Sequence, residues 1–160
     1  MRKRIVELRR TTLPAESDAG WLNLSEIATV EVTSEHEHFP IETVFANDGG
    51  PGWRAARSSK QVIRIIFDEP VAVRRIRLRF DERESERTQE FTLSWYPAAG
   101  GCREIVRQQW NFSRGAATEI EDYALSLDGV AGLELAIQPD ISSDIGVATL
   151  SSWMVGGASG

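Results

Sequence analysis

The sequence lacks the features that mark secreted and membrane proteins. Cys102 is the only cysteine of the chain, so no internal disulfide bond can form. No apolar run approaches the roughly 20 residues that a membrane-spanning helix needs, and no apolar segment follows the basic start of the chain as it would in a secretory signal. These absences predict a cytoplasmic protein that does not span a membrane.

Basic residues are also in the minority. The 160 residues include 18 Lys and Arg against 24 Asp and Glu, which gives a formal net charge of −6 and a pI near 5.0. Non-specific nucleic-acid binding depends on a basic surface that releases counterions, so the composition argues against nucleic acid as a partner. The length suits one domain that buries its own core. We expect an arm or a loosely attached strand over 1–20, the folded domain over 21–155 and a flexible tail over 156–160.

What the sequence does contain is a repeated alternation of apolar and polar residues. This period of two is typical of β-strands with one face in water, and it occurs at 30–33, 75–81, 90–96, 123–127 and 133–137. Residues 62–67 are apolar at most positions and predict a central strand covered on both faces. Turn signals at 68–70, 97–101 and 128–132 separate the runs, and only 40–45 indicates a helical turn. The fold class is therefore all-β: an antiparallel β-sandwich or jelly roll of about eight strands.

Two charged stretches predict solvent-exposed surface. Residues 81–88 alternate acids and arginines and predict a hydrated hairpin loop. Arg75, Arg77 and Arg79 predict an outward row that pairs with strand neighbours such as Glu90 or Glu134.

The order of several short motifs resembles a known family. An Ala-Asn-Asp-Gly turn at 46–49 precedes Trp53, and an apolar strand at 62–67 leads through Pro70 to an Ile-x-Leu strand at 76–78. The chain ends on a Ser-Ser-Trp-Met-Val strand at 151–155. This order resembles the discoidin (coagulation factor 5/8 type C) family of galactose-binding-like jelly rolls, over roughly residues 26–155.

The resemblance also bears on calcium. In many carbohydrate-binding relatives the Asp of this turn, here Asp48, holds a structural calcium ion together with a glutamate on the last strand. Ser152 stands about where that glutamate would be. One carboxylate fewer weakens a calcium site, so we expect either no cofactor or a weak calcium site at Asp48.

The resemblance implies a ligand site in the loops at one end of the jelly roll. His36 and His38 would hydrogen-bond sugar hydroxyls, and Phe39 would stack on a sugar ring. Arg54 and Arg57 would bind hydroxyls, carboxylates or phosphates with their guanidinium groups. A loop at 140–146, in which we single out Asp144, would form the rim. The alternatives are a solvated charged loop with Phe39 in the core, and a metal pair formed by the two histidines, for which the sequence offers no third imidazole.

Three functions follow. The first is a non-catalytic module that binds a carbohydrate or another polyhydroxylated, small polar ligand. The second is an intracellular protein-interaction scaffold, because Trp53-Arg54-Ala55-Ala56 is similar to the N-terminal domain of a eukaryotic DNA-repair scaffold protein. A small enzyme comes third, because no P-loop, nucleophile elbow or zinc-protease motif occurs in the sequence.

Overall fold

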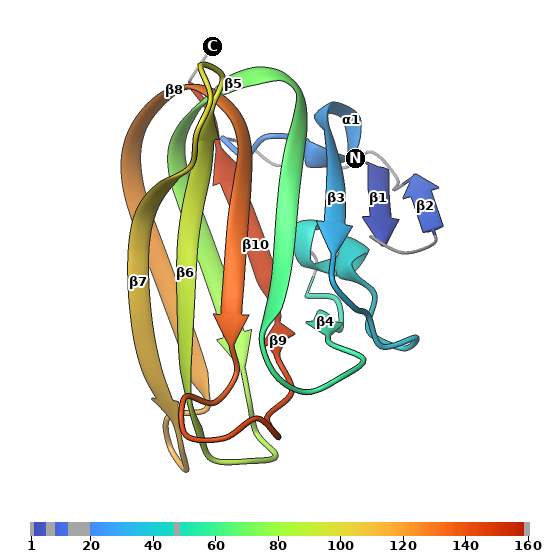
Figure 1. Ribbon diagram of the computed structural model, residues 1–160, viewed down its shortest axis with the longest axis vertical. Helices are drawn as coiled ribbons and strands as arrows, with labels where there is room; N and C mark the ends of the chain where they lie inside the picture. The colour runs from blue at the N-terminus through green and yellow to red at the C-terminus, as the bar shows by residue number, and fades with distance from the viewer. Residues whose placement is uncertain (1, 6–8, 13–19, 47–48, 159–160) are drawn as a thin grey trace.

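The computed structural model describes residues 2–5, 9–12, 20–46 and 49–158, and these form a sandwich of β-strands (Figure 1). The expected all-β architecture is confirmed, and its strands pair antiparallel except for β1 and β3, which pair in parallel among the described residues. The described residues contain two short helical segments, α1 (Leu24–Ile27) and the 3-10 helix Ile41–Phe45, of which only the second was predicted. They also contain ten strands: β1 (Arg2–Ile5), β2 (Arg9–Thr12), β3 (Ala28–Val32), β4 (Trp53–Arg54), β5 (Gln61–Asp81), β6 (Arg87–Pro97), β7 (Arg103–Phe112), β8 (Thr118–Gln138), β9 (Thr149–Leu150) and β10 (Ser152–Gly156).

Two strands of 21 residues each, β5 and β8, run through both layers of the sandwich. They pair with each other along most of their length and bend together near the upper end in Figure 1. The first half of β5 and the second half of β8 lie between β3 and β6, with β7 beyond β6. The second half of β5 pairs with the first half of β8 and with β10, which builds the other layer.

The turn signals at 68–70 and 128–132 were therefore misread as breaks between strands. Both stretches lie inside continuous strands, β5 and β8, at the bend. The β5–β8 ladder shifts register between Ile66 and Val71, and again before Val73 and Arg75. Such bulges let a paired strand bend without losing its partner. Of the three signals, only 97–101 forms a hairpin turn, between β6 and β7.

The core lies between the two layers and follows the predicted alternation. Ile76, Leu78 and Phe80 of β5 are fully buried, and so are Phe91 and Leu93 of β6. The Phe80 and Phe91 rings stack across the core with centroids 5.3 Å apart. In the first half of β5, Ile63 and Ile65 are buried while Val62 and Ile66 are only partly covered, so this strand is central but more exposed on one face than predicted.

The arginine row of β5 faces outward as expected but has other partners than predicted. Arg75 pairs with Asp122 on the neighbouring strand β8, and Arg79 pairs with Asp81 two residues along its own strand. The predicted partner Glu134 lies on the other layer and binds Arg64 instead. The bend in β5 and β8 separates residues that the sequence places on similar strands.

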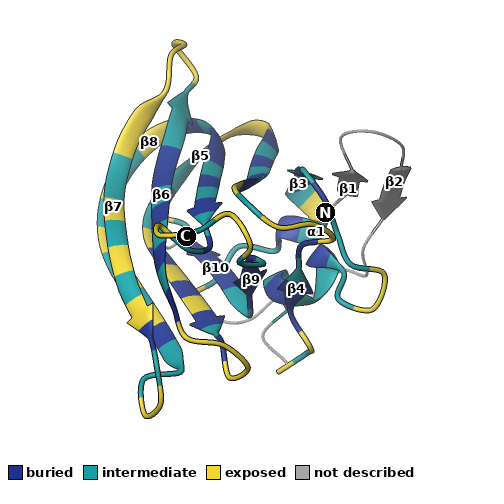
Figure 2. Ribbon diagram, turned by 60° about the horizontal axis from the view of Figure 1, so that its bottom comes forward, coloured by how far each residue is buried: buried dark blue, intermediate teal, exposed yellow. Residues whose placement is uncertain are grey.

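One end of the sandwich collects five loops. The segments that follow β3 and β4, and those that join β5 to β6, β7 to β8 and β8 to β9, all lie at the lower end in Figure 1. Figure 2 turns this end toward the viewer and shows exposed residues along these loops. Backbone hydrogen bonds tie two of the loops together, since the N–H of Ser59 donates to the carbonyl of Gly146 at 3.1 Å. The fold thus brings segments distant in sequence to one surface.

Candidate functional site

Three of the predicted site residues form one cluster at this loop end. His36 and Phe39 lie in the loop after β3, and Arg54 lies at the end of β4. The His36 ring meets the Phe39 ring edge to face at 5.3 Å, and the Arg54 guanidinium carbon lies 5.4 Å from the centroid of Phe39. Backbone hydrogen bonds fix the arrangement: His36 N–H donates to the Arg54 carbonyl at 2.8 Å, and Arg54 N–H to the Phe39 carbonyl at 3.3 Å. We call these three residues the His36–Phe39–Arg54 cluster.

The contacts of His36 determine which of its nitrogens faces a ligand. Its Nδ1 accepts the backbone N–H of His38 at 3.1 Å, so this nitrogen carries a lone pair. In the neutral imidazole the proton then resides on Nε2, which is a donor. His38 itself is exposed, with its Nε2 3.4 Å from a carboxylate oxygen of Glu37. The two histidine rings are 5.5 Å apart, but only His36 belongs to the cluster.

A buried tryptophan supports the cluster from below. Trp53 is almost fully buried, and its Nε1–H donates to the Ser34 carbonyl at 3.0 Å. The Ser34 hydroxyl oxygen accepts the backbone N–H of Ala56 at 3.0 Å and donates to Gln61 Oε1 at 2.6 Å. These bonds join the loop after β3 to the loop after β4, so the positions of His36 and Arg54 depend on each other.

Arg57 and Asp144 were the remaining predicted ligand residues. Arg57 is exposed and donates through Nη2 to the Thr33 carbonyl at 3.1 Å, beside the segment that carries the cluster. Asp144 is exposed in the β8–β9 loop, and no contact of the described residues joins it to the cluster. That loop is ordered instead by Asp140, whose carboxylate accepts both the backbone N–H and the hydroxyl of Ser142.

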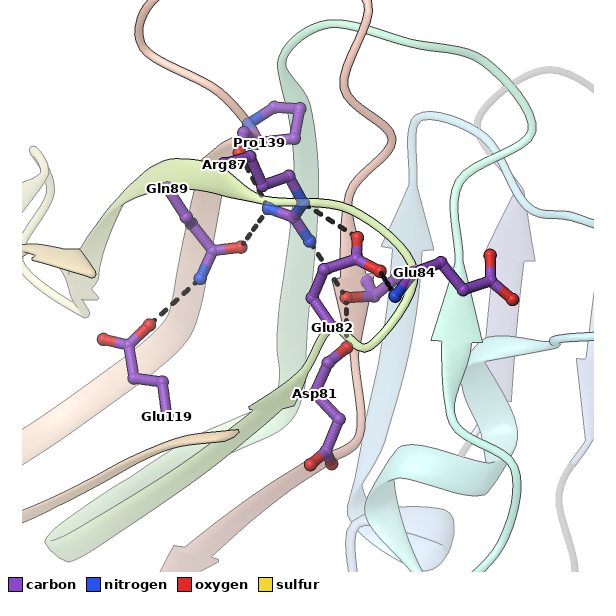
Figure 3. Close-up of polar contacts among 8 residues, drawn as sticks. Asp81, Glu82, Glu84, Arg87, Gln89, Glu119 and Pro139 are labelled. Atoms are coloured by element: carbon purple, nitrogen blue, oxygen red, sulfur yellow. Dashed lines mark hydrogen bonds and ion pairs between the residues drawn. The ribbon is translucent and has the colours of Figure 1, made fainter. Parts of the chain in front are cut away.

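A buried arginine holds the start and the end of the β8–β9 loop. Figure 3 shows Arg87 of β6 beside Glu82, Gln89 and Pro139. Its guanidinium pairs with Glu82 at 2.9 Å and donates to the Pro139 carbonyl at 2.7 Å, to Gln89 Oε1 at 3.2 Å and to Thr149 Oγ1 at 3.3 Å. The side chains of Glu82 and Arg87 are only 6% and 2% exposed, so the prediction of a hydrated loop over 81–88 is wrong for these two residues, while residues 83–86 are exposed as predicted.

The polar chain continues from Gln89 into the core. Gln89 Nε2 donates to Glu119 Oε1 at 3.2 Å (Figure 3). Glu119 is fully buried. Burial, followed by the neighbouring Glu121, raises the pKa of Glu119 to about 9. Glu119 is therefore protonated at neutral pH. No sequence pattern indicated a buried, protonated carboxyl group here, because Glu119 lies in an ordinary strand alternation.

The described residues give no metal centre. They contain no group of three or more His, Cys, Asp or Glu side chains placed to hold an ion. Asp48 lies outside the described residues, so calcium binding there stays a prediction. Gly49, Arg77, Arg79 and Asp81 line a hollow of about 410 Å³, in which Arg79 pairs with Asp81 at 3.0 Å. No helix in the described part of the chain has the length and apolar character needed to cross a membrane.

Comparisons with known proteins show the fold. No family model and no curated protein matches the chain. Among solved structures, the family 32 carbohydrate-binding module of NanJ from C. perfringens, in complex with galactose, has a TM-score of 0.61 at 12% identity, over 82% of this chain and 94% of that one. The family 32 module of AlyQ, in complex with 4,5-unsaturated mannuronic acid, has a TM-score of 0.58 at 13% identity and covers 97% of each chain. The expected galactose-binding-like jelly roll is thus confirmed.

An enzyme also has this fold. Allantoicase from Saccharomyces cerevisiae matches with a TM-score of 0.61 at 14% identity, over 92% of this chain and 46% of that one. The fold therefore occurs both in carbohydrate-binding modules and within enzymes, and the function of this chain has to be argued from its own side chains.

Proposed function

We propose that this protein is a non-catalytic carbohydrate-binding module whose site is the His36–Phe39–Arg54 cluster. The observation that carries the proposal is the convergence of an imidazole, a guanidinium and an aromatic ring at the loop end of the sandwich. Binding sites for polar ligands combine apolar surface with a few positioned polar groups. The carbohydrate complexes of NanJ and AlyQ, which share the fold, support this reading.

Each residue has a distinct part in this proposal. His36 Nε2–H donates a hydrogen bond to a sugar oxygen, because its Nδ1 is already engaged by the backbone. Arg54 supplies a planar set of donors that fits two neighbouring oxygens. Phe39 positions the guanidinium on one of its faces, and its remaining surface contacts the apolar side of a sugar ring. Arg57 and Asp144 form the rim, and the exposed imidazole of His38 takes no part in binding.

The test is a titration of the ¹⁵N-labelled protein with a panel of neutral and acidic mono- and oligosaccharides, followed by amide chemical shifts. We expect shifts at residues 33–40 and 53–58 with at least one sugar. His36→Ala should abolish them, while His38→Ala is the matched control that removes an exposed imidazole from the same loop. No shift with any saccharide at millimolar concentration would overturn the proposal.

A protein-interaction scaffold is the second candidate, and one observation favours it. The β8–β9 loop exposes two isoleucines, with Ile141 49% and Ile145 84% exposed. Apolar side chains at a loop tip are more typical of a protein contact than of a sugar site. Binding of a defined protein that Ile145→Ser abolishes, together with a negative saccharide panel, would establish this candidate.

A further inference from the structure

Arg54 differs from the other buried or partly buried arginines of the described residues because its guanidinium has no counter-charge. Among arginines whose side chains are described, four are buried or partly buried: Arg54, Arg64, Arg74 and Arg87. Each of the last three pairs with a carboxylate: Arg64 with Glu31 and Glu134, Arg74 with Asp128, and Arg87 with Glu82. Arg54 has no ion pair or side-chain hydrogen bond to any described residue and rests only on the Phe39 ring.

The carboxylates closest in sequence to the cluster have other contacts. Glu35 Oε1 accepts the backbone N–H of Ile41 at 2.7 Å, and the Glu37 carboxylate lies against His38. The nearby cations on the loop after β4, Arg57 and Lys60, add positive charge at the same end. A partly buried cation is stabilised by an anion at hydrogen-bond distance, and the described residues supply none to Arg54.

The hydrogen-bonding groups of the cluster also favour an anionic ligand. Arg54 can only donate, and His36 presents Nε2–H as a donor because its Nδ1 accepts from the backbone. A ligand group made only of acceptors would match both. A carboxylate is such a group, and its two oxygens fit the planar guanidinium through two parallel hydrogen bonds.

We infer that the ligand of this site is an acidic saccharide, a uronic acid whose carboxylate binds Arg54 with His36 beside it. This inference rests on the proposed carbohydrate function and narrows it to one class of sugar. The carboxylate completes the ion pair that the fold leaves open, and Phe39 fixes the plane of the guanidinium for it.

The test compares pairs of sugars that differ only at C6, where one carries a carboxylate and the other a hydroxymethyl group. D-galacturonic acid and D-galactose, and D-glucuronic acid and D-glucose, are titrated into the full chain by calorimetry or NMR. We expect at least one uronic acid to bind about tenfold or more tightly than its neutral partner, as charged hydrogen bonds do over neutral ones. Raising sodium chloride from 50 to 500 mM should weaken the uronic acid and leave the neutral sugar unchanged.

Variants then locate the effect. Arg54→Gln should remove the preference for the uronic acid. Arg103→Gln is the matched control: Arg103 also lies over an aromatic ring, 5.6 Å from the centroid of Trp95, and its loss changes the net charge equally. It lies on β7, away from the cluster, and the preference should survive its replacement.

The outcomes separate this inference from the proposal beneath it. A neutral sugar that binds as well as its uronic acid, in a His36-dependent way, overturns the inference and leaves the carbohydrate function standing. Absence of all saccharide binding overturns both. Inorganic phosphate is included as a third arm, and Arg54-dependent phosphate binding without uronic acid binding would also overturn the inference.

Discussion

Replacing Arg87 by methionine should destabilise the domain severely. The variant removes the guanidinium that lies over the Phe112 ring and leaves Glu82 buried without its cation. It also removes the donors to the Pro139 carbonyl and to Thr149. Breaking a buried ion pair costs about 3–5 kcal/mol. For a domain of this size that corresponds to a fall of roughly 10 °C in the melting temperature.

The assay is urea denaturation at pH 7, followed by tryptophan fluorescence, with three further variants, one of them the single change Glu82→Gln. Arg107→Met is the control, because its ion pair with Glu104 is exposed at both ends (60% and 50%) and should contribute less than about 1 kcal/mol. Glu82→Gln combined with Arg87→Met should cost less than the sum of the single changes, since the two side chains act as a pair. A loss for Arg87→Met no larger than that for Arg107→Met would refute this reasoning.

Two further predictions concern other buried features. The folded state holds a proton on Glu119 up to about pH 9, while the unfolded chain releases it near 4.5, so the unfolding free energy should fall as pH rises from about 5 to 9. Glu119→Gln should remove this slope, so that the variant becomes more stable relative to the wild type toward pH 9. Unfolding free energies of wild type and variant that change in parallel between pH 5, 7 and 9 would contradict this prediction. Gly52→Ala should cost about 2–4 kcal/mol in the same assay, because φ is +82° and a Cβ would lie 2.8 Å from the Leu150 carbonyl oxygen. Gly115→Ala, at φ +85° with open space around it, should cost only the backbone strain of about 1–2 kcal/mol, and equal losses at both positions would show that the close contact has no effect.

The strands could be predicted from the sequence because one face of each is buried. The period of two at 75–81, 90–96 and 133–137 corresponds to buried side chains on β5, β6 and β8. What local pattern could not show is that β5 and β8 continue through residues that ordinarily end a strand. Pro70 and Gly129 lie at the bend, where register shifts keep the two strands paired. The paired segments are some 60 residues apart, so the local sequence of either segment cannot show that they pair.

The candidate site was predictable in its composition and only partly in its arrangement. The resemblance to discoidin-type jelly rolls put His36, Phe39 and Arg54 at one end, and the structure brings these three together. It does not bring Asp144 into contact with them. The contacts that hold the β8–β9 loop were not predictable either. Arg87 lies in a run of charged residues that composition indicates to be solvated, and its burial depends on partners at 82, 139 and 149 that only the folded chain brings together.

The two bent strands have a consequence for the thermodynamics of recognition. The lower-end loops at 55–60, 82–86, 113–117 and 139–148 all begin or end on β5 or β8, and these strands are shared by both layers. The layers therefore cannot slide or open independently, and the loops are fixed relative to one another before a ligand arrives. A preorganised rim loses little conformational entropy on binding. Affinity at this end should then depend on the few side chains that touch the ligand, with small backbone movement between the free and the bound protein.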